Sequence, residues 1–475
     1  MLPILVSPYD TLLEKMSAPS TFAATGWYDE KLLLSGDKCL IQHHRSPALA
    51  VGVTHISLLH SVFGEFMEHC RSDTVLDMDD NQFVVNFCMK MSEHYEYEDT
   101  RRNEGNALLN AYLGFSIIND NPGTGKTDGT ICWDINSANN KSESRINLNK
   151  MVLLNIEYKN EIGGGNGDPF MQNVGYFVKW LSECKQHKSY GLYLPSFLVS
   201  IVGPLIAVYG VVAYGQRIHC DPLTPYFHLL PVIDDNYSWR TLGRSLRALK
   251  LSLPKLHQYY SDLVAREEGV IPIDLPDHPY PYLTRVHVGK EGDWMEFTYV
   301  KPLGRRVFLC TIPTTGRRIV LKYIQSVQDI DTLTRGQREL ATIGSAPELI
   351  AVTQIPPDWT VTVSEFIDGA RYYDSTPDRD SNLVAALNGL HSLGIVHGDI
   401  RKNNVLVVPN SSRVIIVDFD FTGLHNVGRY PDRLNQDIRW PPGVRDGALL
   451  RIEHDNDFAM RMMEFNTTKL QSPGL

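Results

Sequence analysis

The chain has 475 residues, of which 43% are hydrophobic and 21% are charged, and its formal net charge is -10. This length exceeds what one hydrophobic core usually organises, and the composition excludes an intrinsically disordered or collagen-like protein. The negative charge gives no support for binding nucleic acid through the field of the whole molecule, so such a contact would need a local basic groove.

The amino terminus and the cysteines indicate the compartment. Residues 1–6 (Met-Leu-Pro-Ile-Leu-Val) lack a basic region, a sustained apolar run and a small-residue cleavage site, so they do not form a secretory signal. The seven cysteines are scattered and contain no C-x-x-C pair, which is typical of reduced thiols. We therefore expect an intracellular protein of the cytoplasm or nucleus, without a signal peptide or a membrane association.

The first half of the chain predicts an α/β domain. Residues 1–75 show no clear motif and are interpreted as a lead-in of unclear structure. In 81–115, apolar residues recur at spacings of three and four, which predicts amphipathic helices. The pattern then changes to two strands, a helix and a hairpin, and we assign 76–235 to one domain. The predicted elements are strands 130–135 and 151–159 and a helix over 168–188.

One uncharged stretch, Gly191 to Gly215, is long enough to cross a bilayer. Gly203 and Pro204 divide it into two short β-branched pieces, 197–202 and 205–214. Glycine and proline at such a point are typical of a turn, and the pieces have the composition of strands. The sequence therefore predicts a buried β-hairpin and no transmembrane helix.

A linker is predicted between the two halves of the chain, over 236–289. It consists of a helical stretch, 238–264, and a Pro-rich segment, 271–281, which cannot continue a helix. We place the domain boundary there and assign 290–475 to a second domain.

The second domain begins with short strands that predict an antiparallel sheet. They are 297–303, 307–312 and 318–323, separated by Gly304 and by the turn 313–316. In the third strand, Lys322 follows Val320 and Leu321, and the alternation of a strand directs Lys322 and Leu321 to opposite faces. Considered alone, Lys322 would more often be a solvated lysine at a strand edge.

The strongest motif lies further along. Residues 397–406 are His-Gly-Asp-Ile-Arg-Lys-Asn-Asn-Val-Leu, and Asp418-Phe419-Asp420 follows fourteen residues after Asn404. Two apolar strands, 405–408 and 414–417, lie between them. An antiparallel hairpin places the start of its first strand beside the end of its second, so Asn404 and Asp418 are predicted to lie side by side.

This arrangement suits phosphoryl transfer. Asn404 and Asp418 would hold Mg²⁺ against the phosphates of ATP, and Asp399 would orient the accepting hydroxyl group. Arg401 would stabilise charge on the transferred phosphoryl group. An accidental hairpin with polar ends is the alternative, and the ordered spacing of the whole set argues against it.

These residues resemble the eukaryotic protein kinase-like superfamily over 290–470, and the H-G-D-I-R-K-N-N and D-F-D forms are most similar to fungal kinase-like proteins. The resemblance implies a two-lobed α+β fold with a short C-lobe, ATP and Mg²⁺ as cofactors, and serine/threonine phosphorylation of an unidentified protein. It adds Glu339, on a predicted helix over 329–343, as the partner of Lys322. It also assigns Gly304 to the phosphate loop and Glu365 to the adenine hinge.

The sequence departs from the kinase pattern at several points. A multi-glycine phosphate loop is missing, and Asp420 replaces the glycine of D-F-G. An ATP-binding pseudokinase scaffold therefore stays open as an alternative. H-G-D also resembles small-molecule phosphotransferases, which typically have histidine where this sequence has Arg401, so a small-molecule kinase stays open too.

The middle domain resembles a second family. Asp128 follows a turn, Glu157 and Lys159 share one face at the end of a strand, and Gln172 and Tyr176 are one helical turn apart. This resembles PD-(D/E)XK nucleases, where two carboxylates hold a divalent metal and a lysine positions the attacking water. The resemblance implies a restriction-endonuclease-like domain, in the order found in Crinkler-type effectors. The alternative is a solvated strand end.

Residues 123–127 (Gly-Thr-Gly-Lys-Thr) imitate a phosphate-binding loop. That motif needs glycine where Asp120 stands, and a helix should follow where 128–130 predict a turn. We therefore do not interpret 123–127 as a nucleotide site.

Overall fold

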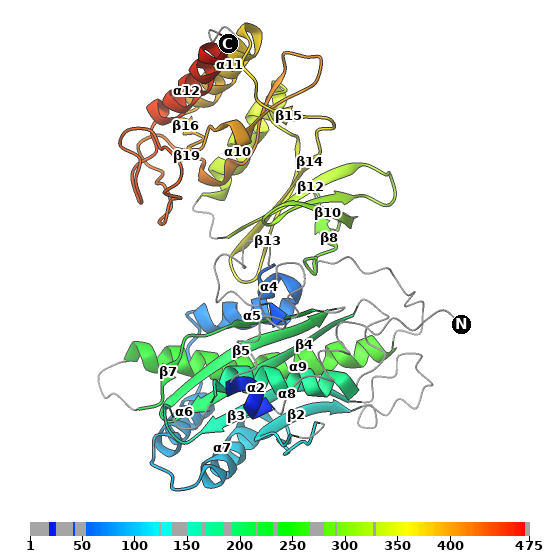
Figure 1. Ribbon diagram of the computed structural model, residues 1–475, viewed down its shortest axis with the longest axis vertical. Helices are drawn as coiled ribbons and strands as arrows, with labels where there is room; N and C mark the ends of the chain where they lie inside the picture. Colours follow the sequence, from blue (N-terminus) through cyan, green and yellow to red (C-terminus); the bar gives the residue numbers. More distant parts are fainter. Residues whose placement is uncertain are drawn as a thin grey trace, which may run out of the picture. The chain divides into compact units, whose positions relative to one another are not determined.

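The computed structural model describes residues 19–24, 41–42, 54–122, 125–134, 150–163, 167–183, 192–214, 217–230, 236–265, 280–289, 292–325 and 329–470. The chain divides into two compact units, Met1–Tyr282 (unit 1) and Leu283–Leu475 (unit 2) (Figure 1). Helices and β-sheet occur in both units, so the predicted α+β class is confirmed at that level. Most of the Pro-rich segment and the first two residues of the 123–127 motif lie outside the described residues.

Unit 1 is built on a seven-stranded mixed sheet. The strand order is β1-β6-β5-β4-β3-β2, with β7 paired to β5. β3 and β4 are parallel, which requires a crossover, and α8 provides it. The strands are β1 Ile41–Gln42, β2 Gly129–Asp134, β3 Lys150–Lys159, β4 Tyr193–Val202, β5 Leu205–Tyr214, β6 Arg217–Pro222 and β7 Phe227–His228.

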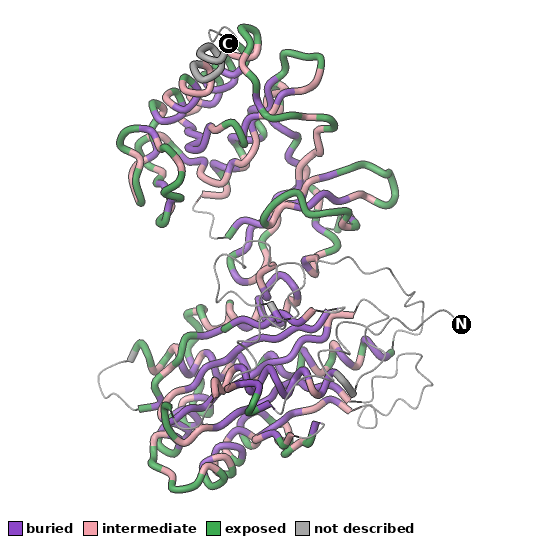
Figure 2. Tube along the Cα trace, viewed as in Figure 1, coloured by how far each residue is buried: buried purple, intermediate pink, exposed green. Residues whose placement is uncertain are grey.

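Helices cover both faces of this sheet. On β3, Asn155 contacts Asn173 of α8 at 2.6 Å, whereas Tyr158 donates to Asn106 of α7 at 3.0 Å from the opposite face. Because both faces are covered, β3, β4 and β5 are buried along nearly their whole length (Figure 2). The helices are α2 Pro19–Ala24, α4 Ile56–Leu59, α5 Ser61–Arg71, α6 Met78–Met91, α7 Glu98–Leu113, α8 Pro169–Glu183 and α9 Asn236–Ala265.

The predicted hairpin is confirmed. β4 and β5 pair antiparallel through a turn at Gly203, whose φ of 50° suits glycine. Among the described residues, no helix is both long enough and apolar enough to span a bilayer.

Two of the predicted boundaries are corrected by packing. Residues 54–75 are not a loose lead-in, because Phe63 and Phe66 are fully buried and contact Phe197 of β4. The helix predicted inside the linker is α9, and its leucines belong to the same core, so it is part of unit 1. An amphipathic helix is stabilised mainly by the surface it packs on, and the pattern of the helix alone does not identify that surface.

A buried arginine fixes the end of β3. Arg101 of α7 is 1% exposed and donates to the carbonyl oxygens of Met91, Asn160 and Gly203. These carbonyls lie at the end of α6, just after β3, and in the β4–β5 turn. Burial lowers the pKa of Arg101, but a guanidinium stays charged, so the carbonyl dipoles compensate the buried charge.

Unit 2 begins with a five-stranded antiparallel sheet in the order β10-β11-β12-β14-β13. α10 packs against it, and α11 and α12 pack against each other in the remaining part. The sheet strands are β10 Thr298–Gly304, β11 Val307–Thr311, β12 Arg318–Gln325, β13 Leu349–Ile355 and β14 Trp359–Glu365. The short strands are β8 Arg285–His287, β9 Trp294–Glu296, β15 Arg371–Tyr372, β16 Ile395–Val396, β17 Val405–Val407, β18 Val414–Ile416 and β19 Gly423–Leu424. The helices are α10 Ile330–Thr342, α11 Pro377–Ser392 and α12 Ile452–Leu470, with 3₁₀ turns η6 Lys402–Asn404 and η7 Phe419–Phe421.

His60 makes the stability of unit 1 depend on pH. Its Nδ1 accepts the backbone N–H of Val62 at the start of α5, and its ring packs edge-on against Tyr259. Burial lowers the pKa of His60 to about 4, below its ordinary 6.5. Between these pH values the unfolded chain binds a proton that the folded chain does not, so the free energy of unfolding should fall as pH drops from 6.5 to 4.

We expect His60→Asn, which keeps a capping acceptor but does not titrate, to remove about 2 kcal/mol of that pH dependence. Chemical denaturation of both proteins at pH 7 and at pH 4.5 measures it. Equal losses of stability in the two proteins would contradict the assignment.

Candidate functional site

A cavity of about 290 Å³ lies in unit 2 between the five-stranded sheet and the segments around β17 and β18. Its apolar lining comes from both sides, for example from Val307 and Val320 of the sheet and Leu406 of β17. Its polar lining consists of Lys322, Gln337, Thr362, Ser364, Glu365, Asn403, Asn404, Asp418 and Asp420.

Lys322 joins the two sides of the cavity. In β12 it pairs in register with Val307 of β11 and Thr362 of β14, two residues that also line the cavity. Its Nζ forms ion pairs with Asp418 and, at 2.6 Å, with Asp420. Asp418 adopts φ 70° and ψ 64°, a left-handed conformation that is costly for a residue other than glycine.

The charged groups of this cluster shift one another's pKa values. Burial acts to lower the pKa of Lys322, but Asp418 and Asp420 outweigh it and the net shift is upward. Burial likewise acts to raise the pKa of Asp418, and Lys322 outweighs it, so that carboxylate stays ionised. One ammonium therefore balances two carboxylates only in part, which leaves negative charge at the polar end of the cavity.

The β17–β18 hairpin brings Asn404 next to Asp418. Val405 pairs with Ile416, and the N–H of Val417 donates to the Asn404 carbonyl at 2.9 Å. The Asn404 side-chain amide donates to Oδ2 of Asp399 at 2.8 Å and to its carbonyl at 2.9 Å. Asn404 thus links the loop that contains Asp399 to the segment after β18 that contains Asp418.

Asp399 is held from two directions. Besides Asn404, the Arg401 guanidinium binds its carboxylate in a bidentate manner, with Nη2 2.6 Å from Oδ2. Hydrogen bonds with Asp399 are the main reason why the pKa of Arg401 is raised. Asp399 is only 5% exposed, and these hydrogen bonds fix the orientation of its carboxylate.

A buried carboxylate from α12 supports this loop. Asp455 is fully buried and accepts the backbone N–H groups of His397 and Gly398, each at 2.8 Å. Gly398 has φ 83°, and a Cβ there would lie 2.9 Å from a methyl group of Leu450. Glycine is required at this position both for its conformation and for its contact.

The expected pairing of Glu339 with Lys322 is corrected. Among the described residues the ion-pair partners of Lys322 are Asp418 and Asp420, and Glu339 lies on the exposed face of α10. Gln337 occupies the cavity side and donates to Ser364 at 2.9 Å. Residues two apart are separated by about 200° around a helix, so Glu339 points away from the cavity when Gln337 points into it.

The phosphate-loop region is a tight turn. Gly304 ends β10, Arg305 and Arg306 form the turn, and Val307 begins β11, with Arg306 at φ 63°. A Cβ on Gly304 would meet no described atom within 4 Å, so the position does not demand glycine. Glu365 ends β14 and lines the cavity.

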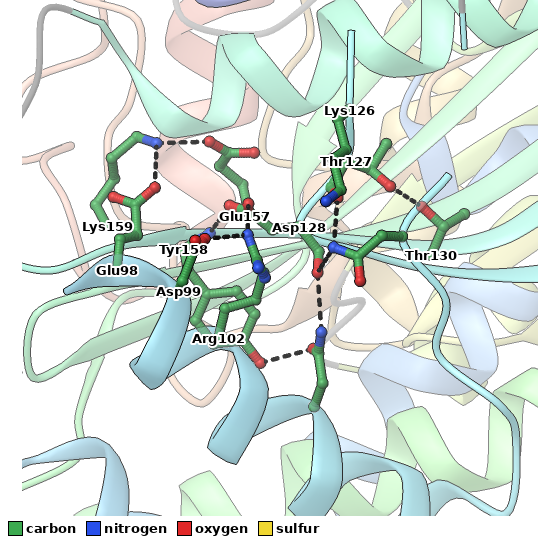
Figure 3. A network of polar contacts seen from close by, with 12 residues as sticks. Glu98, Asp99, Arg102, Lys126, Thr127, Asp128, Thr130, Glu157, Tyr158 and Lys159 are labelled. Atoms are coloured by element: carbon green, nitrogen blue, oxygen red, sulfur yellow. Dashed lines mark hydrogen bonds and ion pairs between the residues drawn. The ribbon is translucent and has the colours of Figure 1, made fainter. Parts of the chain in front are cut away.

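A second polar cluster lies at the end of β3 in unit 1 (Figure 3). The register of β2 and β3 pairs Gly129 with Ile156, which places Asp128 level with Glu157. Asp128 accepts the Tyr158 N–H at 2.9 Å, and its second oxygen is 3.5 Å from Arg102 of α7. The structure therefore brings Asp128 and Glu157 together at the sheet edge.

Lys159 extends this cluster. Its Nζ donates to Glu157 at 2.6 Å and lies 3.6 Å from Glu98, in the first turn of α7. Burial acts to lower the pKa of Lys159, but Glu157 and Glu98 outweigh it and the net shift is upward. The lysine is therefore a cation held between the side chains of two glutamates.

Glu157 has an unusual environment. It is 1% exposed, and its Oε2 has no hydrogen-bond partner among the described residues. Burial, and then the charge of Asp128, raise the pKa of Glu157 to about 8. An unsatisfied buried carboxylate oxygen is costly, and such groups are typical of sites that bind a ligand.

Gln172 lies near this cluster without a direct contact to Glu157 among the described interactions. Its side chain hydrogen-bonds to Tyr176 one turn along α8, and the Tyr176 hydroxyl donates to the Lys126 carbonyl at 2.7 Å. Burial raises the pKa of Tyr176 to about 12, with Glu157 as the next contribution. Tyr176 therefore contacts both Gln172 and the segment that precedes Asp128.

Both clusters offer oxygen ligands of the kind that Mg²⁺ prefers. In unit 2 these are the Asn404 amide and the Asp418 carboxylate, and in unit 1 they are Asp128 and the free oxygen of Glu157. Across the described part of the chain, no group of three or more His, Cys, Asp or Glu side chains has metal-binding geometry. Each site would therefore rely on two protein ligands, with substrate or water completing the shell.

Three residues of these clusters were not assigned roles from the sequence. Asp420 was noted only as a replaced glycine, yet it pairs with Lys322. Glu98 gave no signal beyond an acidic residue at the start of a helix. Asp455 was visible only as the second residue of His454-Asp455 before a helix, and its buried contacts depend on the tertiary fold.

Comparisons with known proteins give a limited result. No family model matches the chain. Among solved structures, the PK-1 kinase of Cydia pomonella granulovirus is similar to part of it, with 17% identity and a TM-score of 0.25. The match covers 29% of this chain and 58% of the viral kinase, so it spans less than two thirds of that protein. The likeness to a kinase is therefore partial.

Glu157 should reduce the stability of the folded protein at alkaline pH. A carboxyl group whose folded pKa is raised contributes stability below its ordinary pKa of 4.5, and that stability is lost as pH rises to about 8. We expect Glu157→Gln to raise the free energy of unfolding by about 2 kcal/mol at pH 8.5 and to change it little at pH 5. Glu161→Gln, at an exposed glutamate, is the matched control. Equal effects at both pH values would contradict the raised pKa.

Proposed function

We propose that unit 2 is an ATP- and Mg²⁺-dependent phosphotransferase that acts on a protein hydroxyl group, as a serine/threonine protein kinase. The observation that supports this most is the convergence of Lys322, Asn404 and Asp418 on one cavity, with Asp399 hydrogen-bonded to Asn404. These are the residue types that position a nucleotide and an accepting hydroxyl during phosphoryl transfer.

The cavity offers a distinct place for each part of the nucleotide. The apolar part, between Val320 and Leu406, suits a purine ring, and the backbone after Glu365 offers it hydrogen-bonding groups. Lys322 lies at the polar end, where its ammonium would bind phosphate oxygens. Mg²⁺ bound with the nucleotide would neutralise phosphate charge, and Asn404 and Asp418 are the residues that would hold it.

The acceptor would be handled by the loop around Asp399. Asp399 would accept the proton of the hydroxyl group, and Asn404 keeps the carboxylate in a defined orientation. Arg401 holds both oxygens of the same carboxylate, so an acceptor must share or displace this contact. Asp455 fixes the backbone of the loop through two hydrogen bonds and would act as a positioning residue.

We expect Asp399→Asn to reduce transfer of the γ-phosphoryl group about 10²-fold or more, because the amide cannot accept the proton. Incubation with γ-labelled ATP, Mg²⁺ and generic protein substrates measures the transfer. Asp378→Asn, at an exposed aspartate of α11, is the matched control and should retain the activity.

Thermal melts with and without nucleotide separate the alternatives. Stabilisation of the wild type by ATP, with no transfer to any substrate, would indicate a scaffold that only binds the nucleotide. Full activity of Asp399→Asn would remove the catalytic assignment. Transfer only to small hydroxyl compounds would replace the protein acceptor by a small molecule.

We infer a second activity for unit 1, the metal-dependent hydrolysis of phosphodiester bonds. The specific observation that favours it is the buried Glu157 carboxylate, with one oxygen unpartnered among the described residues, beside Asp128 and Lys159. Asp128 and Glu157 would hold a divalent cation, and Lys159 would position the attacking water. The overall charge of -10 gives this reading no support, so the substrate would be held by local contacts.

We expect cleavage of plasmid DNA in Mg²⁺ or Mn²⁺ to fall at least 10²-fold in Glu157→Ala and in Lys159→Ala, because each loses one part of the proposed centre. Agarose gels over a time course measure the cleavage, and EDTA should abolish it. Glu161→Ala is the control for loss of an acidic side chain. Cleavage that survives in both variants would show that the activity arises elsewhere.

A further inference from the structure

Residues 423–451, which run from β19 to the start of α12, are rich in exposed arginine. It contains five arginines, no lysine and three aspartates, within a chain whose overall charge is negative. The arginines Arg429, Arg433, Arg439, Arg445 and Arg451 are all exposed. We call residues 423–451 the arginine segment.

Trp440 anchors the arginine segment next to the catalytic loop. Its ring packs against Phe421, Tyr430 and Phe458 at centroid distances of 5.8–6.2 Å. The guanidinium carbon of Arg401 lies 6.0 Å from the same ring. Arg401 also binds Asp399 directly, so a single side chain connects Trp440 to the proposed proton acceptor.

The segment is held in shape by its own contacts. The N–H of Tyr430 donates to the Ala448 carbonyl at 2.8 Å, which closes the loop at its base. Asp446 accepts the N–H groups of Arg433 and Leu434 at 2.9 and 3.0 Å, and these bonds lower the pKa of Asp446. They also bring Arg433 close to Arg445, the neighbour of Asp446.

The charges of these arginines are not neutralised within the described part of the chain. No ion pair occurs there for any of the five, although Arg429 donates to the Gly447 carbonyl at 2.8 Å. Asp446 is occupied by backbone N–H groups, which leaves Asp432 and Asp437 as the other carboxylates of the segment. Five exposed guanidinium groups, one of them hydrogen-bonded to a carbonyl, thus lie on a loop that contains only two further acidic side chains.

We propose that the arginine segment is the docking surface for the acceptor and that it selects hydroxyl-bearing peptides rich in aspartate, glutamate or phosphorylated residues. Guanidinium groups bind carboxylates and phosphates through paired hydrogen bonds, and the arginine segment reaches the Asp399 loop through Trp440 and Arg401. This inference rests on the proposed kinase function and adds to it the chemical class of the substrate.

The test measures binding and transfer separately on the full-length chain. The probes are two fluorescein-labelled peptides, one with a serine among glutamates and the other with the same serine among lysines. Fluorescence anisotropy without ATP gives the dissociation constants. We expect the glutamate peptide to bind at least tenfold more tightly at 50 mM NaCl, and this preference should shrink at 300 mM NaCl because salt screens exposed charges.

Substitution of arginines tests the surface itself. The double variant Arg439→Ala with Arg445→Ala should weaken binding of the glutamate peptide about tenfold. Arg335→Ala with Arg338→Ala removes the same charge from the exposed face of α10 and should leave binding unchanged. Equal affinity of the wild type for both peptides, or an equal loss in both double variants, would overturn the proposal.

Transfer from γ-labelled ATP to each peptide distinguishes this inference from the proposed function. Preferential binding of the glutamate peptide without transfer would contradict the kinase activity and retain the docking surface. Transfer to both peptides at the same rate would retain the kinase activity and contradict the docking surface.

Discussion

The ion pairs of Lys322 with Asp418 and Asp420 are the constraint on which the unit 2 site depends. They connect the central strand β12 to the turn that follows β18, and they cross the cavity that separates these elements. Removing one partner of a buried ion pair typically costs about 3–5 kcal/mol, and these side chains are partly exposed, so the cost here should be lower. A divalent cation bound there would balance their excess of negative charge.

Unit 1 contains a similar cluster of charged side chains, which comes from different kinds of elements. Lys159 lies between Glu157 and Glu98, so one ammonium again contacts two acidic side chains. There the two carboxylates come from a strand and from the start of a helix, and Arg101 holds the strand end in place. Among the described residues one oxygen of the buried Glu157 has no hydrogen-bond partner, and the stability of the surrounding fold must offset that cost.

Local patterns predicted much of this structure, and tertiary packing determined the rest. The β4–β5 hairpin and the adjacency of Asn404 and Asp418 follow from strand pairing across a short turn, which the residues themselves specify. The direction of the Glu339 side chain does not follow from a local pattern. The rotation of α10 about its axis depends on packing, where Gly336 lies against Thr422 and Leu390. The same reason explains why α9 was assigned to a linker: the pattern marks an apolar face and not its partner.

The departures from the kinase pattern around Asp399 form a consistent set. At position 398 the backbone has a positive φ, and a side chain there would collide with Leu450, so arginine in its usual place is incompatible with this loop. The guanidinium is supplied instead by Arg401, which binds Asp399 and lies against Trp440. Asp455 meanwhile holds the loop through backbone N–H groups, a contact that does not depend on the side chain at 398. The glycine at position 398 is therefore explained by the geometry of the loop.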